Sequence, residues 1–194
     1  MSQDQDQYYI DKVINGDTNA FVILVDQYKQ MVFTLALRML NNREEAEEVS
    51  QDVFLKVYGS LSKFKGDSKF STWLYKIAYH SSLDYLKKRK RRIKTEAIDD
   101  YTVNKLVSYE NSINPMEVAE DRMRIKKGIQ ELAGDDAVLI TLHYFEELSL
   151  KEISKIVGSN VNTVKVRLFR ARKKLAKILK YSLEPEIIQN YGNK

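Results

Sequence analysis

The sequence predicts an all-α protein made of two small helical domains joined by a flexible linker. Only 7 glycines and 2 prolines occur in 194 residues, so there are few places at which a helix must end. Apolar residues recur three and four positions apart on both sides of a central stretch, 95–116, that has no such period. Hydrophobic residues make up 43% of the chain and charged residues 30%, which is enough apolar material for packed cores.

The first domain, residues 1–94, is predicted to contain four helices. Gly16 ends the first, Asp17 or Thr18 caps the second, and Asn42 caps the third. The predicted helices span 8–16, 20–42, 43–58 and 71 to the basic run at 87–94. The inward-facing residues of the first helix are expected to be Tyr9, Ile10, Val13 and Ile14.

The third predicted helix carries an acidic cluster. Five carboxylates occur within nine residues: Glu44, Glu45, Glu47, Glu48 and Asp52. Negative charge near a helix N-terminus complements the helix dipole, so helix stabilisation explains part of the cluster. Five carboxylates exceed that need in a chain whose net charge is +5. The surplus predicts a docking face for a basic protein surface, with helix stabilisation alone as the alternative.

Aromatic rings and cations alternate around the start of the fourth helix. Residues 59–69 have no period but contain Phe64, and the helix that follows runs into seven basic residues among the eight from Lys87 to Lys94. The helix itself carries Trp73, Tyr75, Lys76, Tyr79 and His80. Rings interleaved with cations beside a flexible loop suit stacking on unpaired bases along a phosphate backbone. Rings in the core and a solvated basic helix end are the alternative.

The second domain follows a polar linker. The linker, 95–115, is rich in Asp, Asn and Ser. The domain itself, 116–183, is predicted to begin with helices over 116–132 and 136–145, and the tail, 184–194, is expected to fray.

The end of the second domain holds the most specific motif of the chain. Ser149 and Glu152 form the S-x-x-E capping box that opens a short helix. Gly158 supplies a turn, and the last helix runs from Asn160, a good N-cap, to Lys180. Nine Lys or Arg and no acidic residue lie between Glu152 and Glu184. A short helix, a glycine turn and a basic second helix predict a DNA-binding helix-turn-helix. An amphipathic hairpin with a solvated basic face is the alternative.

The sequence contains no pattern typical of an enzyme or a metal site. His80 and His143 lie far apart without ligand-spaced acids, and neither a Gly-rich phosphate loop nor a nucleophile elbow occurs. The chain has no cysteine, so it is compatible with a reducing compartment. No apolar run approaches about 18 residues, and the N-terminus lacks the basic region of a signal peptide. We expect a cytoplasmic protein with no enzyme activity, cofactor, metal, small-molecule substrate or direct membrane insertion.

Four segments, taken in order, resemble one family. Residues 46–58 (AEEVSQDVFLKVY) resemble the polymerase-clamp-binding helix of bacterial sigma factors, and 64–78 (FKGDSKFSTWLYKIA) resemble their promoter-melting segment. Residues 142–149 (LHYFEELS) and 163–175 (TVKVRLFRARKKL) resemble their C-terminal domain. The resemblance covers about 8–181, lacks the extra middle domain of housekeeping members, and is to the extracytoplasmic-function group of the sigma-70 family.

This resemblance implies a promoter-specificity subunit of bacterial RNA polymerase, with promoter DNA and an anti-sigma factor as further partners. It implies that a clamp coiled coil of core polymerase binds Glu48, Gln51, Asp52 and Leu55. It implies that the downstream (−10) element is recognised and melted by Phe64, Lys65, Gly66, Asp67, Ser68, Lys69, Phe70, Trp73, Tyr75, Lys76, Tyr79, His80, Lys87, Lys88 and Arg89. It implies that the upstream (−35) element is read in the major groove by Asn162, Thr163, Lys165, Val166, Arg167, Phe169, Arg170, Arg172, Lys173 and Lys174. The linker is expected to follow the path of nascent RNA.

Three positions depart from the family pattern. Members often have Leu-Pro where this chain has Leu132-Ala133, and Gly where it has Glu147. A left-handed backbone at Glu147 would cost on the order of 1 kcal/mol. His80 stands where members often carry Asn, in a position tied to the downstream element.

Two other classes of protein compete with this interpretation. A stand-alone transcriptional regulator would use the helix-turn-helix for DNA and the first domain for a ligand or for dimerisation. A structural or scaffold protein would leave both basic clusters unexplained.

Overall fold

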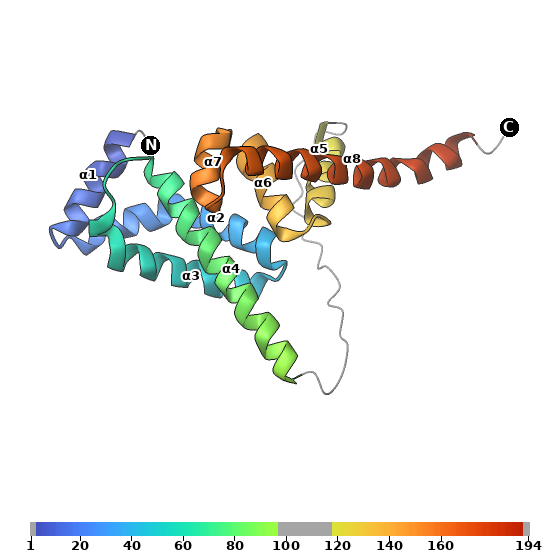
Figure 1. Ribbon diagram of the computed structural model, residues 1–194. Helices are drawn as coiled ribbons and strands as arrows, with labels where there is room; N and C mark the ends of the chain where they lie inside the picture. The colour runs from blue at the N-terminus through green and yellow to red at the C-terminus, as the bar shows by residue number, and fades with distance from the viewer. Residues whose placement is uncertain (1–2, 97–117, 192–194) are drawn as a thin grey trace.

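The computed structural model describes residues 3–96 and 118–191, and their side chains over 4–92 and 123–180. Within these ranges the chain is helical and contains no strand, which confirms the predicted all-α class (Figure 1). The elements in order are α1 Gln3–Ile14, α2 Thr18–Leu40, α3 Arg43–Ser60, the 3₁₀ turn η1 Leu61–Lys63, α4 Phe70–Glu96, α5 Val118–Gln130, α6 Gly134–Tyr144, α7 Leu150–Val157 and α8 Val161–Tyr191. The predicted linker falls almost entirely outside the described residues.

The turns between the early helices follow from their capping residues. The Asp17 carboxylate accepts hydrogen bonds from two backbone amides of the first turn of α2. At the other end of α2, Asn41 adopts a left-handed backbone with φ of 54°, a conformation that Asn tolerates better than most residues. Asn42 then accepts from the Glu45 amide at 3.0 Å and begins α3. Two adjacent asparagines therefore end one helix and start the next.

Helix α2 is the centre of the first domain and packs against α1, α3 and α4. Eight of its 23 residues are buried, among them Leu24, Val32 and Leu35. Among the described helices it alone is long and apolar enough, by length and composition, to cross a membrane. Its sequence is interrupted by the exposed pair Asp26 and Lys29, and its apolar face is occupied by the other helices.

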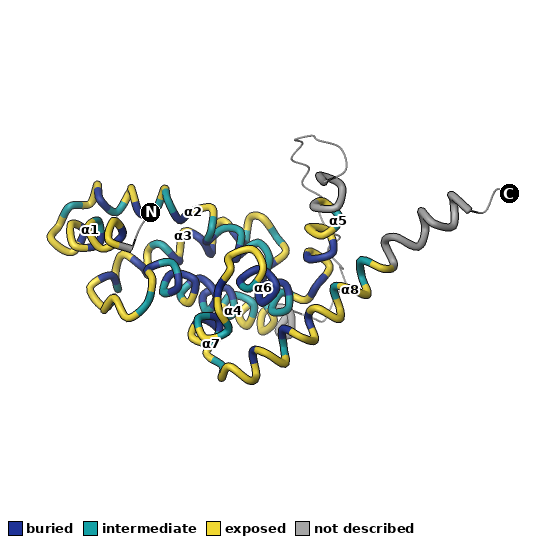
Figure 2. The backbone as a smooth tube through the Cα atoms, turned by 90° about the horizontal axis from the view of Figure 1, so that it is seen from above, coloured by how far each residue is buried: buried dark blue, intermediate teal, exposed yellow. Residues whose placement is uncertain are grey.

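The hydrophobic core continues from the first domain into the second. Helix α6 packs on α2, and α7 packs on α4, so that the second domain lies against the first through these two helices (Figure 1). Viewed from above, α4, α6 and α7 gather at the centre, while α8 runs along the outside with many exposed residues (Figure 2). At one contact a Cβ added to Gly134 would lie only 2.9 Å from the Met39 carbonyl oxygen. The two domains therefore touch directly.

Two expectations about the helix ends were wrong. Ile14 was expected to face inward but is 49% exposed, at the last residue of α1. Asp6 is buried instead, where its carboxylate accepts from the Tyr28 hydroxyl at 2.8 Å. Helix α8 was expected to end at Lys180 but continues to Tyr191. Residues 181–191 contain no glycine that would end the helix. They contain Pro185, and a helix can accommodate a proline by kinking, with the loss of one backbone hydrogen bond.

Candidate nucleic-acid interface

The helix-turn-helix forms as its sequence predicts. The Ser149 hydroxyl and the Glu152 carboxylate make the reciprocal capping box that starts α7. Gly158 ends α7 with a left-handed φ of 66°, a conformation in which glycine avoids the strain of a side chain. The Asn160 side chain accepts from the Thr163 amide at 2.8 Å and starts α8. With Val164 fully buried below, the turn holds the start of α8 at a defined angle to α7.

The predicted upstream-element residues form one outer surface of α8. Val166 is 48% exposed and Phe169 is 47% exposed, with Lys165 and Arg170 exposed beside them. Asn162, Thr163, Arg172, Lys173 and Lys174 are also exposed, and Arg167 is half-buried. The helix thus presents apolar and cationic groups together, as a helix entering the major groove requires.

Several cations of this surface are held by neighbouring groups. Lys173 Nζ lies 4.8 Å from the centroid of the Phe169 ring, and the Arg172 guanidinium lies 5.9 Å from it. Lys174 pairs with Asp136 at 2.6 Å, and Arg167 pairs with Asp135 at 3.0 Å. These contacts orient the cations before any ligand binds.

The loop between η1 and α4 is anchored by aromatic rings and exposes its polar tip. Phe70 is buried, and Phe64 packs edge-on against it with centroids 5.6 Å apart. Trp73 packs against both rings, with its ring centroid 5.4 Å from that of Phe64 and 5.8 Å from that of Phe70. Lys65, Gly66, Asp67 and Lys69 are exposed, and Ser68 is half-buried. In this conformation the three rings hold the loop and the polar tip faces solvent.

The face of α4 predicted to bind the separated strand is largely covered. Tyr75 and Tyr79 are each 3% exposed; α7 packs on α4, and Asp135 at the start of α6 lies 3.1 Å from the Tyr79 hydroxyl. His80 is half-buried, while Lys76, Lys87 and Lys88 are exposed. Arg89 is held by Glu45 at 2.6 Å. The sequence placed both tyrosines on an exposed helix face, and the tertiary structure places them between the two domains.

The acidic face of α3 is open to solvent. Glu48, Gln51, Asp52 and Leu55 are all exposed, and Leu55 has 72% of its surface accessible. Glu48 accepts a long hydrogen bond from the Tyr85 hydroxyl at 3.4 Å. Among the described residues Asp52 takes part in no salt bridge. An exposed leucine beside uncompensated carboxylates is typical of a protein-binding surface.

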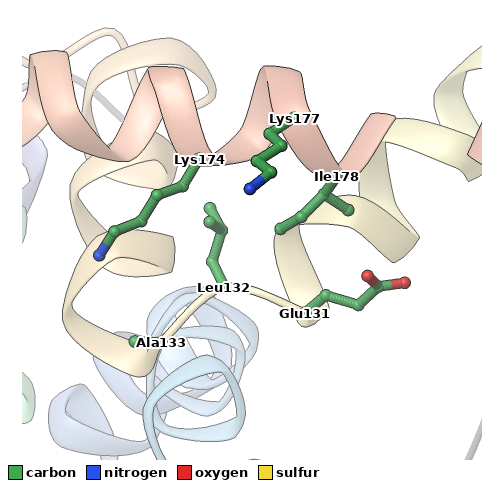
Figure 3. A pocket seen from close by; sticks show the side chains of 6 residues that line it. All are labelled: Glu131, Leu132, Ala133, Lys174, Lys177 and Ile178. Atoms are coloured by element: carbon green, nitrogen blue, oxygen red, sulfur yellow. The ribbon is translucent and has the colours of Figure 1, made fainter. Parts of the chain in front are cut away.

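Two grooves flank α8. One, of about 320 Å³, lies between α8 and the turn from α5 to α6, and Figure 3 shows Lys174 and Lys177 reaching over Leu132 and Ala133 at its floor. The other, of about 360 Å³, is lined mainly by apolar residues of α5, α6 and α8. Neither lining brings together a nucleophile and a base.

Sequence reasoning missed three residues that the structure places between the domains. Arg38, at the end of α2, donates to the Thr141 hydroxyl and lies 5.6 Å from the Phe145 ring centroid. The Glu146 carboxylate, in the turn after α6, helps raise the pKa of the Tyr75 hydroxyl, whose burial is the main cause. Asp135 accepts from Tyr79 at 3.1 Å. No local pattern marks these residues, because each acts on a partner from the other domain.

The comparisons with known proteins agree with this geometry. The family model for sigma-70 region 2 matches residues 24–92, and the model for sigma-70 region 4 matches residues 122–175. The RNA polymerase sigma-H factor of Pseudomonas aeruginosa is 34% identical over 92% of this chain and 96% of its own length. The chain belongs to the sigma-70 family.

Other relatives place this sigma factor in the extracytoplasmic-function (ECF) group. The ECF sigma factor SigW of Bacillus subtilis is 36% identical over 88% of this chain and 95% of its own length. The ECF sigma-E factor of Escherichia coli K12 is 35% identical over 86% of this chain and 90% of its own length. The resemblance stated from the sequence is therefore confirmed. As a sigma factor the protein directs RNA polymerase to promoters.

Solved structures share the fold of this sigma factor. The sigma factor RpoE bound to the anti-sigma factor NepR from Bartonella quintana matches with a TM-score of 0.65 and 22% identity, over 82% of this chain and 96% of that one. CnrH in complex with the cytosolic domain of CnrY matches with a TM-score of 0.61 and 22% identity, over 91% of this chain and 98% of that one.

Proposed function

We propose that this sigma factor docks on core RNA polymerase through α3, reads the upstream element through α8, and opens the downstream element through α4 and the loop before it. The observation that carries this proposal is the arrangement of three chemically distinct surfaces on one chain. An acidic face with an exposed leucine lies on α3, a basic face with an exposed phenylalanine lies on α8, and rings with cations lie at the start of α4.

Docking follows from the charge of the α3 face. Glu48, Gln51 and Asp52 line one side of the helix and suit a basic coiled coil on the polymerase. Leu55 adds apolar area that would be removed from water on binding.

Upstream recognition follows from the exposed side chains of α8. Arg170 is exposed next to Val166 and Phe169, where a guanidinium can donate two hydrogen bonds to one guanine edge. Lys173 and Arg172, already positioned by the Phe169 ring, suit phosphate contacts that add affinity without sequence preference.

Strand opening follows from the chemistry of α4. A protein without ATP chemistry can open a duplex only by binding the separated strand better than the paired one. Flipping one base costs on the order of a few kcal/mol, and stacking on a ring returns about 1–3 kcal/mol. Several rings and cations along one strand are therefore needed, and Tyr75, Lys76, Tyr79 and His80 follow one another along α4 beside the polar loop tip.

The protein is further proposed to act in the cytoplasm, without catalytic chemistry of its own, and to be held by an anti-sigma factor. Its family consists of transcription initiation factors, which supports the first two points. One solved structure with this fold has an anti-sigma factor bound, which supports the third.

A binding and transcription assay tests the docking assignment. The protein is incubated with Escherichia coli core polymerase, and binding and run-off transcription are measured for the wild type, for Asp52→Lys and for Asp26→Lys. Asp52→Lys reverses a charge on the proposed face, so we expect core affinity to fall at least about tenfold, with the melting temperature nearly unchanged. Asp26→Lys makes the same change on α2, away from this face, and should bind like the wild type.

Equal core affinity of all three proteins would remove α3 from the docking assignment. A wild-type protein that does not bind core polymerase at all would instead favour the stand-alone regulator.

A further inference from the structure

Helix α1 has no role in the proposed function, yet it carries a buried carboxylate. The family model for sigma-70 region 2 begins at residue 24, whereas α1 spans Gln3–Ile14. Asp6 is only 6% exposed. Moving a carboxylate out of water is costly unless its partners compensate, and within the described residues no cation pairs with Asp6. Its position therefore needs a reason other than stability.

The partners of Asp6 come from α2. Asp6 Oδ2 accepts from the Tyr28 hydroxyl at 2.8 Å, and Asp6 Oδ1 accepts a long hydrogen bond from Gln27 Nε2 at 3.5 Å. Burial, and then the Asp6 carboxylate, raise the pKa of the Tyr28 hydroxyl, which therefore stays protonated and continues to donate. The Gln27 carbonyl oxygen is buried and has no partner in the part of the chain that the structure describes, so the cluster is not optimised for stability. Its effect is to fix the direction of the Tyr28 ring.

Tyr28 supports the base of the loop that precedes α4. Its ring meets that of Phe70 edge-on, with the centroids 5.4 Å apart. Phe70 in turn lies 5.6 Å from Phe64 and 5.8 Å from Trp73, measured between ring centroids, and these three rings anchor the loop. An edge-to-face pair depends on the direction of both rings, so a Tyr28 ring that is free to tilt would loosen Phe70. Asp6 is thus connected to the loop through a single ring.

Helix α1 also reaches the exposed tip of this loop. It packs on η1 and on α4, the elements that precede and follow the loop, and Figure 1 shows the loop passing beside it. At the tip, Gly66 has a left-handed φ of 74°, and a Cβ added there would lie 4.0 Å from Gln7 Oε1. Asp11 orients the Gln7 amide by accepting from its Nε2 at 2.8 Å. Two consecutive residues of α1 therefore act on the loop, Asp6 at its base and Gln7 at its tip.

We propose that α1 holds the strand-opening loop in place and that Asp6 is a positioning residue for promoter opening, acting through Tyr28 and Phe70. This inference rests on the proposed function, because it takes the loop between η1 and α4 to capture an unpaired base. A loop that is already ordered binds a flipped base without the entropic cost of ordering itself. Asp6 does not touch DNA: it affects how readily the strand is captured, and not which bases are read.

Three substitutions on α1 separate positioning from charge and from stability. Asp6→Ala removes the carboxylate that holds Tyr28. Asp4→Ala is the matched control for charge, because Asp4 is exposed in the same first turn of α1. Val13→Ala is the control for stability, because it removes buried apolar volume from the last turn of the same helix.

Two further substitutions test the hydrogen bond itself. Asp6→Asn keeps a side-chain oxygen that can accept from the Tyr28 hydroxyl, so it should restore the wild-type behaviour. Tyr28→Phe removes the same hydrogen bond from the other side and should behave like Asp6→Ala. The double variant Asp6→Ala/Tyr28→Phe should be no worse than either single variant, because the two groups act as one pair.

The single tryptophan of the chain reports on the loop in the free, full-length protein. Trp73 is half-buried against Phe64 and Phe70, so quenching of its fluorescence by acrylamide increases when this ring cluster loosens. We expect the quenching constant to rise at least about twofold in Asp6→Ala. The Asn variant and both controls should stay close to the wild type.

Strand opening is measured with the polymerase holoenzyme. A promoter selected in vitro with the wild-type holoenzyme is used as an intact duplex and with a pre-melted bubble, and permanganate marks its unpaired thymines. Asp6→Ala should lower opening of the duplex at least about fivefold, while core binding and activity on the bubble stay within about twofold of the wild type. Val13→Ala should lower the melting temperature and open the duplex normally.

Unchanged Trp73 quenching in Asp6→Ala would overturn the link between α1 and the loop. A looser loop with normal duplex opening, or equal losses of opening in Asp6→Ala and Val13→Ala, would overturn the positioning role. The fluorescence measurement needs neither polymerase nor promoter. Failure of this inference can therefore be told apart from failure of the proposed function, in which the wild-type protein would not bind core polymerase or open a promoter.

Discussion

Glu147 adopts a left-handed backbone conformation with φ of 53°, in the turn between α6 and α7. A side chain in that region costs about 1–2 kcal/mol, and replacing it by glycine removes this cost. The greater freedom of glycine in the unfolded chain offsets about 0.5–1 kcal/mol of the stability gained. We therefore predict that Glu147→Gly raises the free energy of unfolding by roughly 0.5–1 kcal/mol, measured by urea denaturation. Glu44→Gly, in the first turn of α3, should lower it instead, because glycine disfavours the helix and the change removes a carboxylate that complements the helix dipole. A loss of stability in Glu147→Gly would mean that the carboxylate makes a compensating contact.

The Glu152 carboxylate accepts from the Ser149 hydroxyl at 2.7 Å and from the Ser149 amide at 2.9 Å. These hydrogen bonds lower the pKa of Glu152 below its ordinary value of 4.5. The folded state therefore gains stability that is fully present above the unfolded pKa and is lost as pH falls through the lower, folded pKa.

The prediction for Glu152 concerns how the stability of the folded protein changes at acid pH. Glu152→Gln keeps a side chain that can cap the helix but removes the carboxylate that titrates. The variant therefore lacks the stability gained from the ionised carboxylate, and its melting temperature should be below that of the wild type near neutral pH. The difference should shrink as the pH falls below about 4. Thermal melts of both proteins across that range measure it, and a difference independent of pH would contradict the assignment.

Among the single helices, α8 combines base-reading and backbone-binding side chains on one surface. Arg170 is exposed beside Val166 and takes part in no salt bridge with the described residues, whereas Arg167 and Lys174 are paired with Asp135 and Asp136. A guanidinium available at the groove-facing surface suits a guanine edge better than one already held by a carboxylate.

We predict that Arg170→Ala reduces discrimination between upstream sequences by about 1–3 kcal/mol at one base pair. Lys173→Ala should instead weaken binding to all sequences alike and reduce the salt dependence. Binding of the polymerase holoenzyme to a set of single-base promoter variants at several salt concentrations separates these effects. An equal loss of affinity by Arg170→Ala on every promoter would refute the base-reading role.

Across the whole molecule, one hydrophobic core extends through both domains. A continuous core makes the parts of a protein unfold together, whereas separate cores unfold independently. We therefore predict one calorimetric transition for the wild type and two for Gly134→Ala. The added Cβ would lie 2.9 Å from the Met39 carbonyl oxygen, where α6 packs on α2, and should push the two domains apart. Gly59→Ala is the control, because a Cβ there meets nothing within 4 Å, and it should retain one transition. Two transitions in the wild type would indicate that the interface contributes little to stability.

Short segments of the sequence were enough to predict the helical fold, most helix boundaries and the chemistry of each surface. Capping residues such as Asn42, Ser149 and Asn160 act on amides three positions away, so their effect can be recognised in any short segment. The apolar period shows which side of each helix is inward for the same reason. The family resemblance depended on these local segments too.

Which of those surfaces are open depends on tertiary packing, which no short segment reveals. Tyr79 and Asp135 are 56 positions apart, and nothing near either residue in the sequence indicates that they meet. Gly134 shows no turn requirement of its own; its lack of a side chain matters because Met39 lies against it. The physical reason is that burial depends on every element packed around a side chain, while a periodic pattern describes only its own helix. Tyr75 and Tyr79 therefore look exposed in the sequence and are covered in the folded protein.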